Sequence, residues 1–599
     1  MKKFKYYFFG IMDAKDKKAF WRYVMVLFLG SVFAVLGIGA VIPFINVLIQ
    51  PEKVMSYQIF DGWGYNHIII ILTVVLIIAF AVKNLVALWL LNYQSKFLFG
   101  LMAKIQGKLF TGYMALPYEY HLNRSTPDLI KNVNNETTML SNYVVAPFGS
   151  FLTELLSSIF VLVVLFWINP VFTILVAIFL VLGVTLFMRL IKVKIEHYSN
   201  VRSEAWSSMT ENVLAGLSGI KESKLYHCEK TFLDAFKKDA VQLKSSSAFQ
   251  LTFQQAPRML IEFIGLTVVM CVLCGFVLVG NTPQSMFVLL GVFGVAAAQL
   301  LPSLNRLTQA MVQIKYGMPA LEGIYNELHQ VKSNDLLLLE QKKKVNTFNF
   351  IDYLKLKDLY YSYADGTQAI KGVSLNIPKN KKIAFVGESG AGKTTLVDLV
   401  MGLYEPLQGH IELDDVVIKN ADQKLAFQKL FAYIPQSIVL YDKTIRENIA
   451  FGVDVDKIDN QRIQACLQAA QLKEFVNQLD QKEYTFIGES GVRLSGGQRQ
   501  RIGIARALYQ EPQILVMDEA TSALDNNTER EVTDVLSKLT NLTIITIAHR
   551  LSTIQDYDVI FVMQNGRVIS SGKYGELLEN CSVFAKIAAS SSKNFKRNE

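Results

Sequence analysis

The sequence predicts an α-helical membrane domain followed by an α/β domain that contains a phosphate-binding loop. Its 599 residues are 51% hydrophobic and only 19% charged, with a mean hydropathy of +0.28, which is too apolar for an ordinary soluble protein. The long apolar runs all lie within residues 1–310, whereas a G-x-x-x-x-G-K-[ST] motif lies in the more polar remainder. We therefore expect a membrane domain over residues 1–345, a second domain over 346–585 and a short tail over 586–599.

Six apolar runs in the first domain are long enough to cross a bilayer, which takes about 20 residues of helix. Lys and Arg are abundant before the first run and in the long segments 93–147 and 192–257, but sparse in the shorter connections. Because basic segments stay on the cytoplasmic side, we expect a multi-pass protein of the cell inner (plasma) membrane with both termini in the cytoplasm. The net charge of +9 then reflects cytoplasmic loops, and we expect no nucleic-acid partner. The runs lie near residues 23–49, 68–92, 148–168, 171–191, 258–280 and 286–309.

Two stretches of the long cytoplasmic segments are candidates for contact with the second domain. They are "MALPYEYHL" over residues 114–122 and "GIKESKLYHCEKTF" over residues 219–232. Helices that continue beyond the membrane would end in short elements there. An ordinary solvated connection is the equally open alternative.

The second domain carries a phosphate-binding loop with its expected flanks. The motif follows the strand-like "KIAFV" and precedes the helix-like "LVDLVMGL". Glycines let backbone N–H groups close around phosphates, Lys393 reaches the terminal phosphates, and the Thr394 hydroxyl ligates Mg²⁺. We expect this loop to hold a nucleotide. Its residues are Gly387, Glu388, Ser389, Gly390, Ala391, Gly392, Lys393, Thr394 and Thr395.

Two acidic residues follow a second buried strand, "ILVMDEA". Asp518 at the strand end is placed to hold Mg²⁺, and Glu519 beside it is placed to polarise an attacking water. A DE pair alone would be an ordinary loop start. Together with the upstream phosphate loop it predicts hydrolysis of the nucleotide.

The segment "LSGGQRQR" over residues 494–501 resembles the signature of ATP-binding cassette (ABC) ATPases. The resemblance spans about residues 350–575 and implies ATP and Mg²⁺ as cofactors. It assigns Tyr363 to stacking on adenine, Gln436 to the Q-loop that joins Thr394 and Asp518 at the metal, and His549 to the switch histidine. Glu519, His549 and Gln436 are then the expected catalytic residues. Further matches are Glu489 of the exporter X-loop, residues 522–525 of the D-loop, and Ser495, Gly496, Gly497 and Gln498 of the signature.

Six apolar helices ahead of one cassette resemble a half-transporter of the ABC exporter type. In that family, ATP held by the phosphate loop of one chain faces the signature of another chain. The resemblance therefore implies a dimer, either of two copies of this chain or with a related half-transporter. It also implies that the stretches at 114–122 and 219–232 are coupling helices.

Three cations in the apolar runs are candidates for a substrate site. Lys83, Arg258 and Arg306 fall in the inner-leaflet half of their helices when depth is counted at about 1.5 Å per residue. A charge inside the membrane is costly and marks a functional hypothesis, and these three suit a phosphate head group. Snorkelling to the interface is the alternative for each, and Arg258 could instead pair with Glu262.

The membrane half also shows a finer resemblance. "GAVIPFINVL", "PRMLIEFIG" and "LPSLNRLTQAMVQIKYGMPALEGIYNEL" are similar to the bacterial flippases of lipid-linked oligosaccharides in protein N-glycosylation. The cargo implied is a polyprenyl-pyrophosphate-linked oligosaccharide or a similar phosphate-bearing lipid. Lys83 stands in place of an arginine of those flippases, which keeps the charge but loses the bidentate fork. A drug or peptide exporter, and an ATP-gated channel or regulator without cargo, remain open as alternatives.

Overall fold

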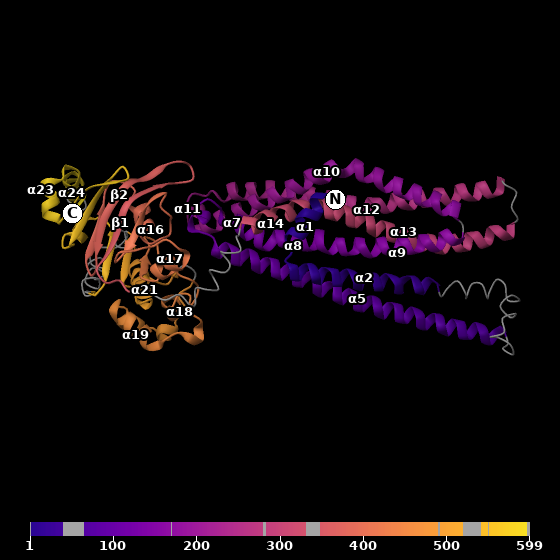
Figure 1. Ribbon diagram of the computed structural model, residues 1–599, viewed down its shortest axis with the longest axis horizontal. Coiled ribbons are helices and arrows are strands. Elements are labelled where there is room, and N and C mark those ends of the chain that lie inside the picture. Colours follow the sequence, from indigo (N-terminus) through magenta and orange to yellow (C-terminus); the bar gives the residue numbers. More distant parts are fainter. Residues whose placement is uncertain are drawn as a thin grey trace. The chain divides into compact units, whose positions relative to one another are not determined.

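The computed structural model describes residues 2–39, 65–168, 170–278, 283–330, 348–488, 491–518, 539, 541–548 and 550–595 of the chain. Within these ranges the chain forms two compact units (Figure 1). The first unit is helical. The second contains the described residues from Phe348 onward together with the short segment Pro117–Tyr120, which is separated from them in sequence. Each unit is described by itself.

The first unit is built from helices much longer than a bilayer is thick. At 1.5 Å per residue, the 51 residues of α5 span about 75 Å, whereas the hydrocarbon core is about 30 Å thick. The helices of this unit are α1 (Lys2–Gly10), α2 (Ala14–Gly39), α5 (Tyr65–Ala115), α7 (Thr126–Ile130), η2 (Lys131–Glu136), α8 (Thr137–Leu140), η3 (Ser141–Val145), α9 (Ala146–Ile168), α10 (Pro170–Ser218), α11 (Ile220–Leu225), α12 (Glu229–Leu278), α13 (Pro283–Tyr316) and α14 (Met318–Gln330). The short helix α6 (Tyr118–Leu122) begins in the segment that belongs to the second unit.

Composition along α5 explains its length. Its first part, "YNHIIIILTVVLIIAFAVKNLVALWLLNY", is apolar and exposes large side chains such as Leu85 and Leu88. Its second part carries Lys96, Lys104 and Lys108. The apolar part suits a lipid environment and the basic part suits water. We therefore expect one continuous helix to cross the membrane and extend into the cytoplasm.

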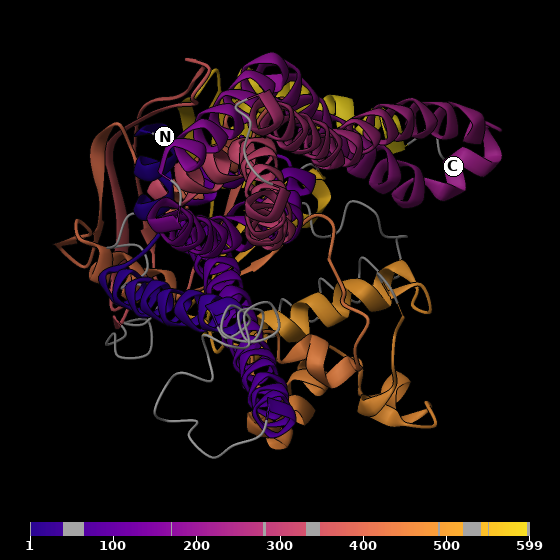
Figure 2. The same ribbon diagram turned by 90° about the vertical axis from the view of Figure 1, so that its right-hand side faces the viewer.

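Each of the six predicted apolar runs falls on one long helix, although residues 40–49 and 279–280 of two runs lie outside the described ranges. Asn66–Ala115 and Thr126–Trp167 both meet the length and hydropathy needed for a membrane span. α10 packs along α12, α9 along α13, and α2 along α5. Figure 2 shows the α10–α12 pair on one side of the bundle, with α2 and α5 on another.

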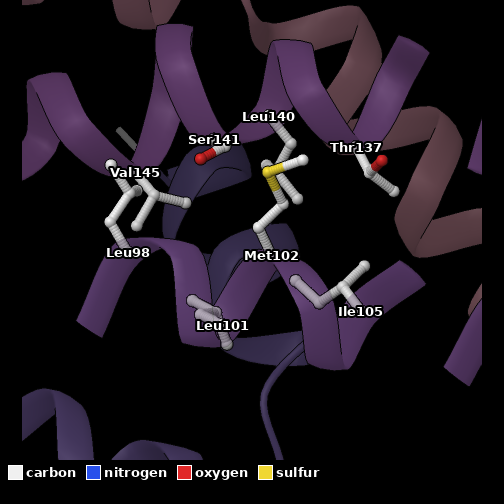
Figure 3. Close-up of a pocket in the computed structure, with 8 residues that line it drawn as sticks. All are labelled: Leu98, Leu101, Met102, Ile105, Thr137, Leu140, Ser141 and Val145. Carbon is white, nitrogen blue, oxygen red and sulfur yellow. The ribbon is translucent and has the colours of Figure 1, made fainter. Parts of the chain in front are cut away.

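A narrow apolar gap separates α5 from the segment that leads into α9 (Figure 3). Leu98, Leu101, Met102 and Ile105 of α5 face this gap. It leaves no room for a water molecule, so it is a packing feature rather than a ligand site. Thr137, Leu140, Ser141 and Val145 line its other side.

The second unit contains two sheets. One has four strands in the order β2-β1-β4-β5, all antiparallel. The other has six strands in the order β10-β9-β3-β8-β7-β6, parallel except for the β10–β9 edge. The strands are β1 (Tyr353–Ser362), β2 (Gln368–Pro378), β3 (Lys382–Val386), β4 (Gln408–Leu413), β5 (Val416–Val417), β6 (Phe431–Ile434), β7 (Ile514–Asp518), β8 (Thr543–Ile547), β9 (Val559–Gln564) and β10 (Arg567–Gly572).

The parallel strands β3, β7 and β8 are buried along most of their length, as their uninterrupted apolar sequences predict. Helices join the strands of this unit. They are α16 (Lys393–Val400), α17 (Ala421–Gln428), α18 (Ile445–Ile449), η4 (Val455–Lys457), α19 (Asn460–Ala469), α20 (Lys473–Asn477), η5 (Lys482–Tyr484), α21 (Gly496–Tyr509), η7 (Leu551–Ile554), α23 (Tyr574–Asn580) and α24 (Ser582–Phe595).

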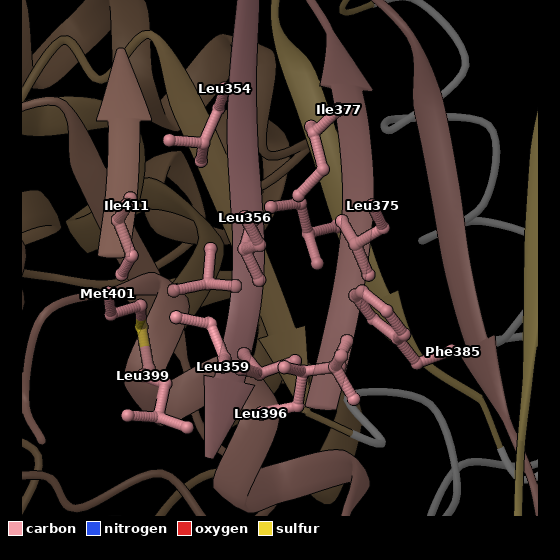
Figure 4. Close-up of a cluster of buried hydrophobic side chains, with 14 of the residues drawn as sticks. Leu354, Leu356, Leu359, Leu375, Ile377, Phe385, Leu396, Leu399, Met401 and Ile411 are labelled. Atoms are coloured by element: carbon pink, nitrogen blue, oxygen red, sulfur yellow. The ribbon is translucent and has the colours of Figure 1, made fainter. Parts of the chain in front are cut away.

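The main core of the second unit lies between the two sheets and around α16 (Figure 4). Leu354 and Leu356 of β1 and Ile377 of β2 pack in the same cluster as Phe385 of β3 and Leu396 of α16. All five side chains are almost fully buried. This core fixes the end of β3 and the start of α16, which are the two flanks of the phosphate loop.

Candidate nucleotide site and membrane cations

The loop between β3 and α16 has the backbone that a phosphate cradle needs. Gly390 has a φ of 80° and Gly392 a φ of 97°, which are conformations that side chains disfavour. A Cβ on Gly392 would lie 2.8 Å from the carbonyl oxygen of Ala369, and one on Gly387 would lie 2.3 Å from that of Met563. Because glycine is required on both steric and conformational grounds, the glycines of the motif serve the loop's shape.

Lys393 begins α16 with its ammonium folded back over the loop. Its Nζ donates to the carbonyl oxygens of Gly387 at 2.9 Å and Glu388 at 3.0 Å, and the residue is only 6% exposed. The ammonium therefore already lies at the centre of the cradle. Carbonyl partners hold it at the place where the β- and γ-phosphates of a nucleotide would offer stronger, charge-assisted bonds.

Tyr363 lies next to the phosphate loop, as the predicted adenine contact requires. Its hydroxyl is 2.6 Å from the Thr395 hydroxyl, and its ring remains 37% exposed. The Tyr361 ring meets it edge-on with centroids 5.4 Å apart. An exposed, positioned ring of this kind can stack on a base.

Asp518 ends β7 on the same sheet edge as the phosphate loop. The Tyr433 hydroxyl donates to its Oδ2 over 3.4 Å. Burial, and then the negative charge of Asp518, raise the pKa of nearby Asp398 to about 7. The carboxylate of Asp518 and the hydroxyl of the exposed Thr394 are oxygen donors of the kind that Mg²⁺ prefers.

The signature residues form the start of α21. Ser495 is the N-cap: its Oγ accepts from the Gln498 N–H at 3.2 Å, and its own N–H donates to Gln498 Oε1 at 2.8 Å. Ser495 and Gly496 are exposed, whereas Gly497 is buried. A Cβ on Gly496 would meet open space, so internal packing does not require glycine there. An exposed helix start suits contact with an anion, because the first backbone N–H groups of a helix have no acceptor within the helix.

Several of the predicted site residues lie in parts of the chain that the structure does not describe. Glu519, His549, Glu489 and residues 522–525 lie outside the described ranges. Gln436 is described and is exposed just beyond β6. In the part of the chain that the structure describes, no group of three or more His, Cys, Asp or Glu residues could hold a metal by itself.

The segment Pro117–Tyr120 belongs to the second unit. For this part of the 114–122 stretch, the structure therefore shows the expected contact with the second domain and not a solvated connection. Tyr361 donates from its hydroxyl to Glu119 Oε1 at 2.5 Å. The Tyr118 and Tyr404 rings have centroids 5.9 Å apart, and Tyr404 stacks on Tyr361 at 4.8 Å. Sequence reasoning missed these partners, because nothing in the motifs separates Tyr361 and Tyr404 from other buried aromatics.

The two membrane arginines have carboxylate partners. Arg258 pairs with Glu262 at 2.8 Å. This ion pair is the alternative to a substrate contact that the sequence suggested. Arg306 binds Glu154 of α9 through two nitrogens, with Nη2 at 3.2 Å from Oε2. The sequence analysis missed Glu154, which lies 152 residues away from Arg306. Both arginine side chains remain more than half exposed, whereas the Glu154 side chain is only 13% exposed.

Lys83 lies apart from the arginines within one chain. Its ammonium is 5.2 Å from the centre of the Phe80 ring, and among the described residues no carboxylate lies within ion-pair distance of it. Its helix α5 packs mainly along α2, whereas α12 and α13, which carry Arg258 and Arg306, pack on each other. The structure therefore brings the helices of the two arginines together and leaves Lys83 on a different part of the bundle.

Comparison with protein families covers both units. Residues 20–300 match the ABC transporter transmembrane region, and residues 370–522 match the ABC transporter family. A solved structure of a bacterial Atm1-family ABC exporter with ATP bound aligns with a TM-score of 0.77 at 21% identity, over 96% of this chain and 99% of that one. The predicted fold class, a six-helix exporter-type membrane domain ahead of an α/β cassette, is confirmed.

Curated relatives match along almost the whole chain. An ATP-dependent lipid A-core flippase of Francisella tularensis is 30% identical over 591 residues, which is 95% of this chain and 93% of that protein. One of Cupriavidus pinatubonensis is 30% identical over 81% of each chain, and one of Saccharophagus degradans is 34% identical over 62% of this chain and 61% of that protein. The chain thus belongs to the ABC transporter family, as an exporter-type half-transporter that binds and hydrolyses ATP to drive transport.

Proposed function

We propose that two copies of this chain form an ATP-driven flippase that moves a phosphate-bearing lipid or glycolipid across the inner membrane. The observation that carries this proposal is the end-to-end similarity to relatives named lipid A-core flippases. The accessible cations of the membrane helices support the same cargo class. Both termini are proposed to lie in the cytoplasm, since the basic segments flank the apolar runs on that side.

We propose nucleotide roles in which the cradle holds the phosphates. Lys393 would leave the carbonyls of Gly387 and Glu388 for the terminal phosphates, and Tyr363 would stack on adenine. Thr394, Gln436 and Asp518 would hold Mg²⁺, which when bound neutralises phosphate charge during hydrolysis. Glu519 is proposed as the residue that activates water, and His549 as the switch residue beside it.

The signature supports a shared site. Ser495 and Gly496 are exposed at the start of α21, and no packing contact explains why a glycine stands at 496. We propose that Ser495, Gly496, Gly497 and Gln498 of one copy contact the phosphates held by the other copy.

The tip of the second cytoplasmic loop also needs a partner. Ile220 is 47% exposed, Leu225 68% and Tyr226 71%, in or directly after α11. A cluster of this kind rarely remains in water unless it docks on another surface. A second copy of the chain would cover it, in keeping with the proposed homodimer.

The substrate contact is proposed to involve Lys83, Arg258 and Arg306. The two arginines hold carboxylates in this conformation, so a phosphate group would have to displace Glu262 and Glu154. Such an exchange suits a transporter, because the carboxylates re-form their pairs when the cargo leaves. Lys83, on a different helix pair, would reach the head group from another side.

Two head groups are candidates, and one experiment separates them. The finer sequence resemblance favours a polyprenyl-pyrophosphate-linked oligosaccharide, and the names of the relatives favour lipid A-core. The purified protein in nanodiscs would be titrated with each lipid, with dephosphorylated forms of both, and with a drug and peptide panel, while ATP hydrolysis is measured. Stimulation by a phosphorylated lipid but not by its dephosphorylated form supports the proposal. Stimulation by drugs or peptides alone would overturn it.

A further inference from the structure

The exposed face of α1 and of the first turns of α2 is strongly cationic. The two helices meet at the N-terminal corner of the first unit. All of the basic side chains in residues 2–22 are exposed, and none of them takes part in an ion pair within the described ranges. They are Lys2, Lys3, Lys5, Lys15, Lys17, Lys18 and Arg22.

The acids of this corner do not offset its charge. Residues 2–22 contain two carboxylates, Asp13 and Asp16. Lys108 reaches Asp13 at 2.5 Å, and Lys104 reaches Asp16 at 2.6 Å. Both lysines belong to α5, so the two aspartates are paired with residues outside the corner. They do not pair with the seven basic side chains of the corner.

The corner is held at a defined level of the bundle. The ring centroids of Phe4 and Phe8 both lie 5.1 Å from that of Phe148, and Phe8 lies 5.6 Å from Phe20. Phe148 opens the apolar run of α9, and Phe20 precedes that of α2. The corner therefore lies where the apolar surface of the helices begins.

Rigid packing and exposed aromatics complete the surface. The Tyr7 hydroxyl donates to Glu322 Oε1 of α14 at 2.8 Å, which fixes α1 against the unit. Tyr6 is 64% exposed and Trp21 is 60% exposed, although both belong to the same corner. Exposed Tyr and Trp beside Lys and Arg are typical of groups that lie at lipid head-group level.

We propose that this corner is a binding surface for the anionic phospholipid head groups of the cytoplasmic leaflet. Clusters of four to eight basic residues beside a membrane helix attract anionic lipid, each charge adding to the attraction near the surface. The bound lipids would be annular lipids that hold the corner in place. They differ from the cargo, and the inference does not depend on which lipid is transported.

The test compares lipid selectivity in the reconstituted full-length protein. The probes are spin-labelled phosphatidylglycerol and spin-labelled phosphatidylcholine, added separately at equal fraction to phosphatidylcholine vesicles, and the motionally restricted fraction of each is measured. We expect wild type to prefer phosphatidylglycerol by about threefold or more, and to lose this preference as NaCl is raised from about 50 mM to 500 mM.

Two matched variants locate the site. One carries K2Q, K3Q, K5Q, K17Q and K18Q, and the other carries K237Q, K238Q, K244Q, K419Q and K473Q, five exposed lysines outside the corner and outside the proposed coupling stretches. The first should lose the preference and the second should keep it, with basal ATP hydrolysis unchanged in both. Equal loss in both variants would overturn the proposal, as would a preference that persists in the first. If the first variant cannot be purified, a wild-type preference that is absent or insensitive to salt overturns it equally.

Discussion

The hydroxyl of Tyr361 donates a hydrogen bond to the carboxylate of Glu119, although the two residues are 242 positions apart. Tyr361 lies on β1, two residues before Tyr363, and Glu119 lies on α6 between the long helices α5 and α9. One short bond therefore joins a strand beside the proposed adenine contact to a segment that continues into the membrane helices. Tyr404 stacks on Tyr361 and reinforces this contact.

Tyr361→Phe should weaken coupling between ATP hydrolysis and transport while leaving the aromatic stacking intact. A hydrogen bond to a charged group contributes about 1.5–3 kcal/mol, so we expect about a tenfold loss of lipid-stimulated hydrolysis with basal hydrolysis little changed. The matched control is Tyr353→Phe, which removes a similar bond, to Asp415 at 2.6 Å, from the other end of β1. Equal effects of both substitutions would show that the Glu119 contact has no special role.

A mixed dimer should reveal whether ATP sites are shared. When a Ser495→Arg chain pairs with a Lys393→Ala chain, a shared arrangement leaves one site with both lesions and one with neither. We expect each homodimeric variant to be nearly inactive and the mixed dimer, isolated through two different tags, to recover roughly half of wild-type hydrolysis. If the isolated mixed dimer is as inactive as either parent, the shared site is wrong.

The membrane cations should matter for cargo but not for basal hydrolysis. Neutralising Lys83 and Arg306 together should reduce lipid-stimulated hydrolysis about 100-fold or more, since two charge-assisted contacts to phosphate are lost. Glu154→Gln should instead raise lipid affinity, because it releases Arg306 from its partner. Arg189→Gln, at an exposed position on α10, is the control. Normal stimulation in the double variant would reduce Lys83 to an interfacial anchor.

Asp398 should make the nucleotide-free, magnesium-free protein less stable as pH rises. Its pKa is raised to about 7 by burial and then by the charge of Asp518, so the folded protein retains a proton that the unfolded chain releases near pH 4. Its stabilising effect is complete below about pH 4 and is lost as pH rises to about 7. Asp398→Asn should therefore raise the melting temperature relative to wild type by an amount that grows between pH 5 and pH 7. A constant difference over that range would contradict this assignment.

The fold was predictable because its signals are local. Runs of about 20 apolar residues mark membrane helices, and the glycines at 387, 390 and 392 stand where a Cβ or the backbone conformation forbids other residues. The start of α21 was also predictable, since Ser495 and Gln498 form a capping box that reads directly from the motif. These features depend on neighbours within a few residues.

The missed contacts are those that join distant segments. Glu154 precedes Arg306 by 152 residues, and no periodicity indicates that α9 and α13 meet at that level. The same is true of Glu119 and Tyr361. Arg258 was the simpler case, because Glu262 lies one turn away on the same helix and could be named beforehand. Ion pairs between different helices can be predicted only when the packing of those helices is known, and a single sequence does not reveal that packing.

The central claim is ATP-driven movement of a phosphate-bearing lipid, and flipping in proteoliposomes tests it most directly. A fluorescent polyprenyl-pyrophosphate glycan, and in parallel a fluorescent lipid A-core, would be followed by protection from a membrane-impermeant quencher. Wild type with ATP and Mg²⁺ should move at least one of them, whereas Glu519→Gln should bind ATP but move neither. Equal movement without ATP or by Glu519→Gln, or no movement of either lipid by an ATP-hydrolysing wild type, would contradict the account.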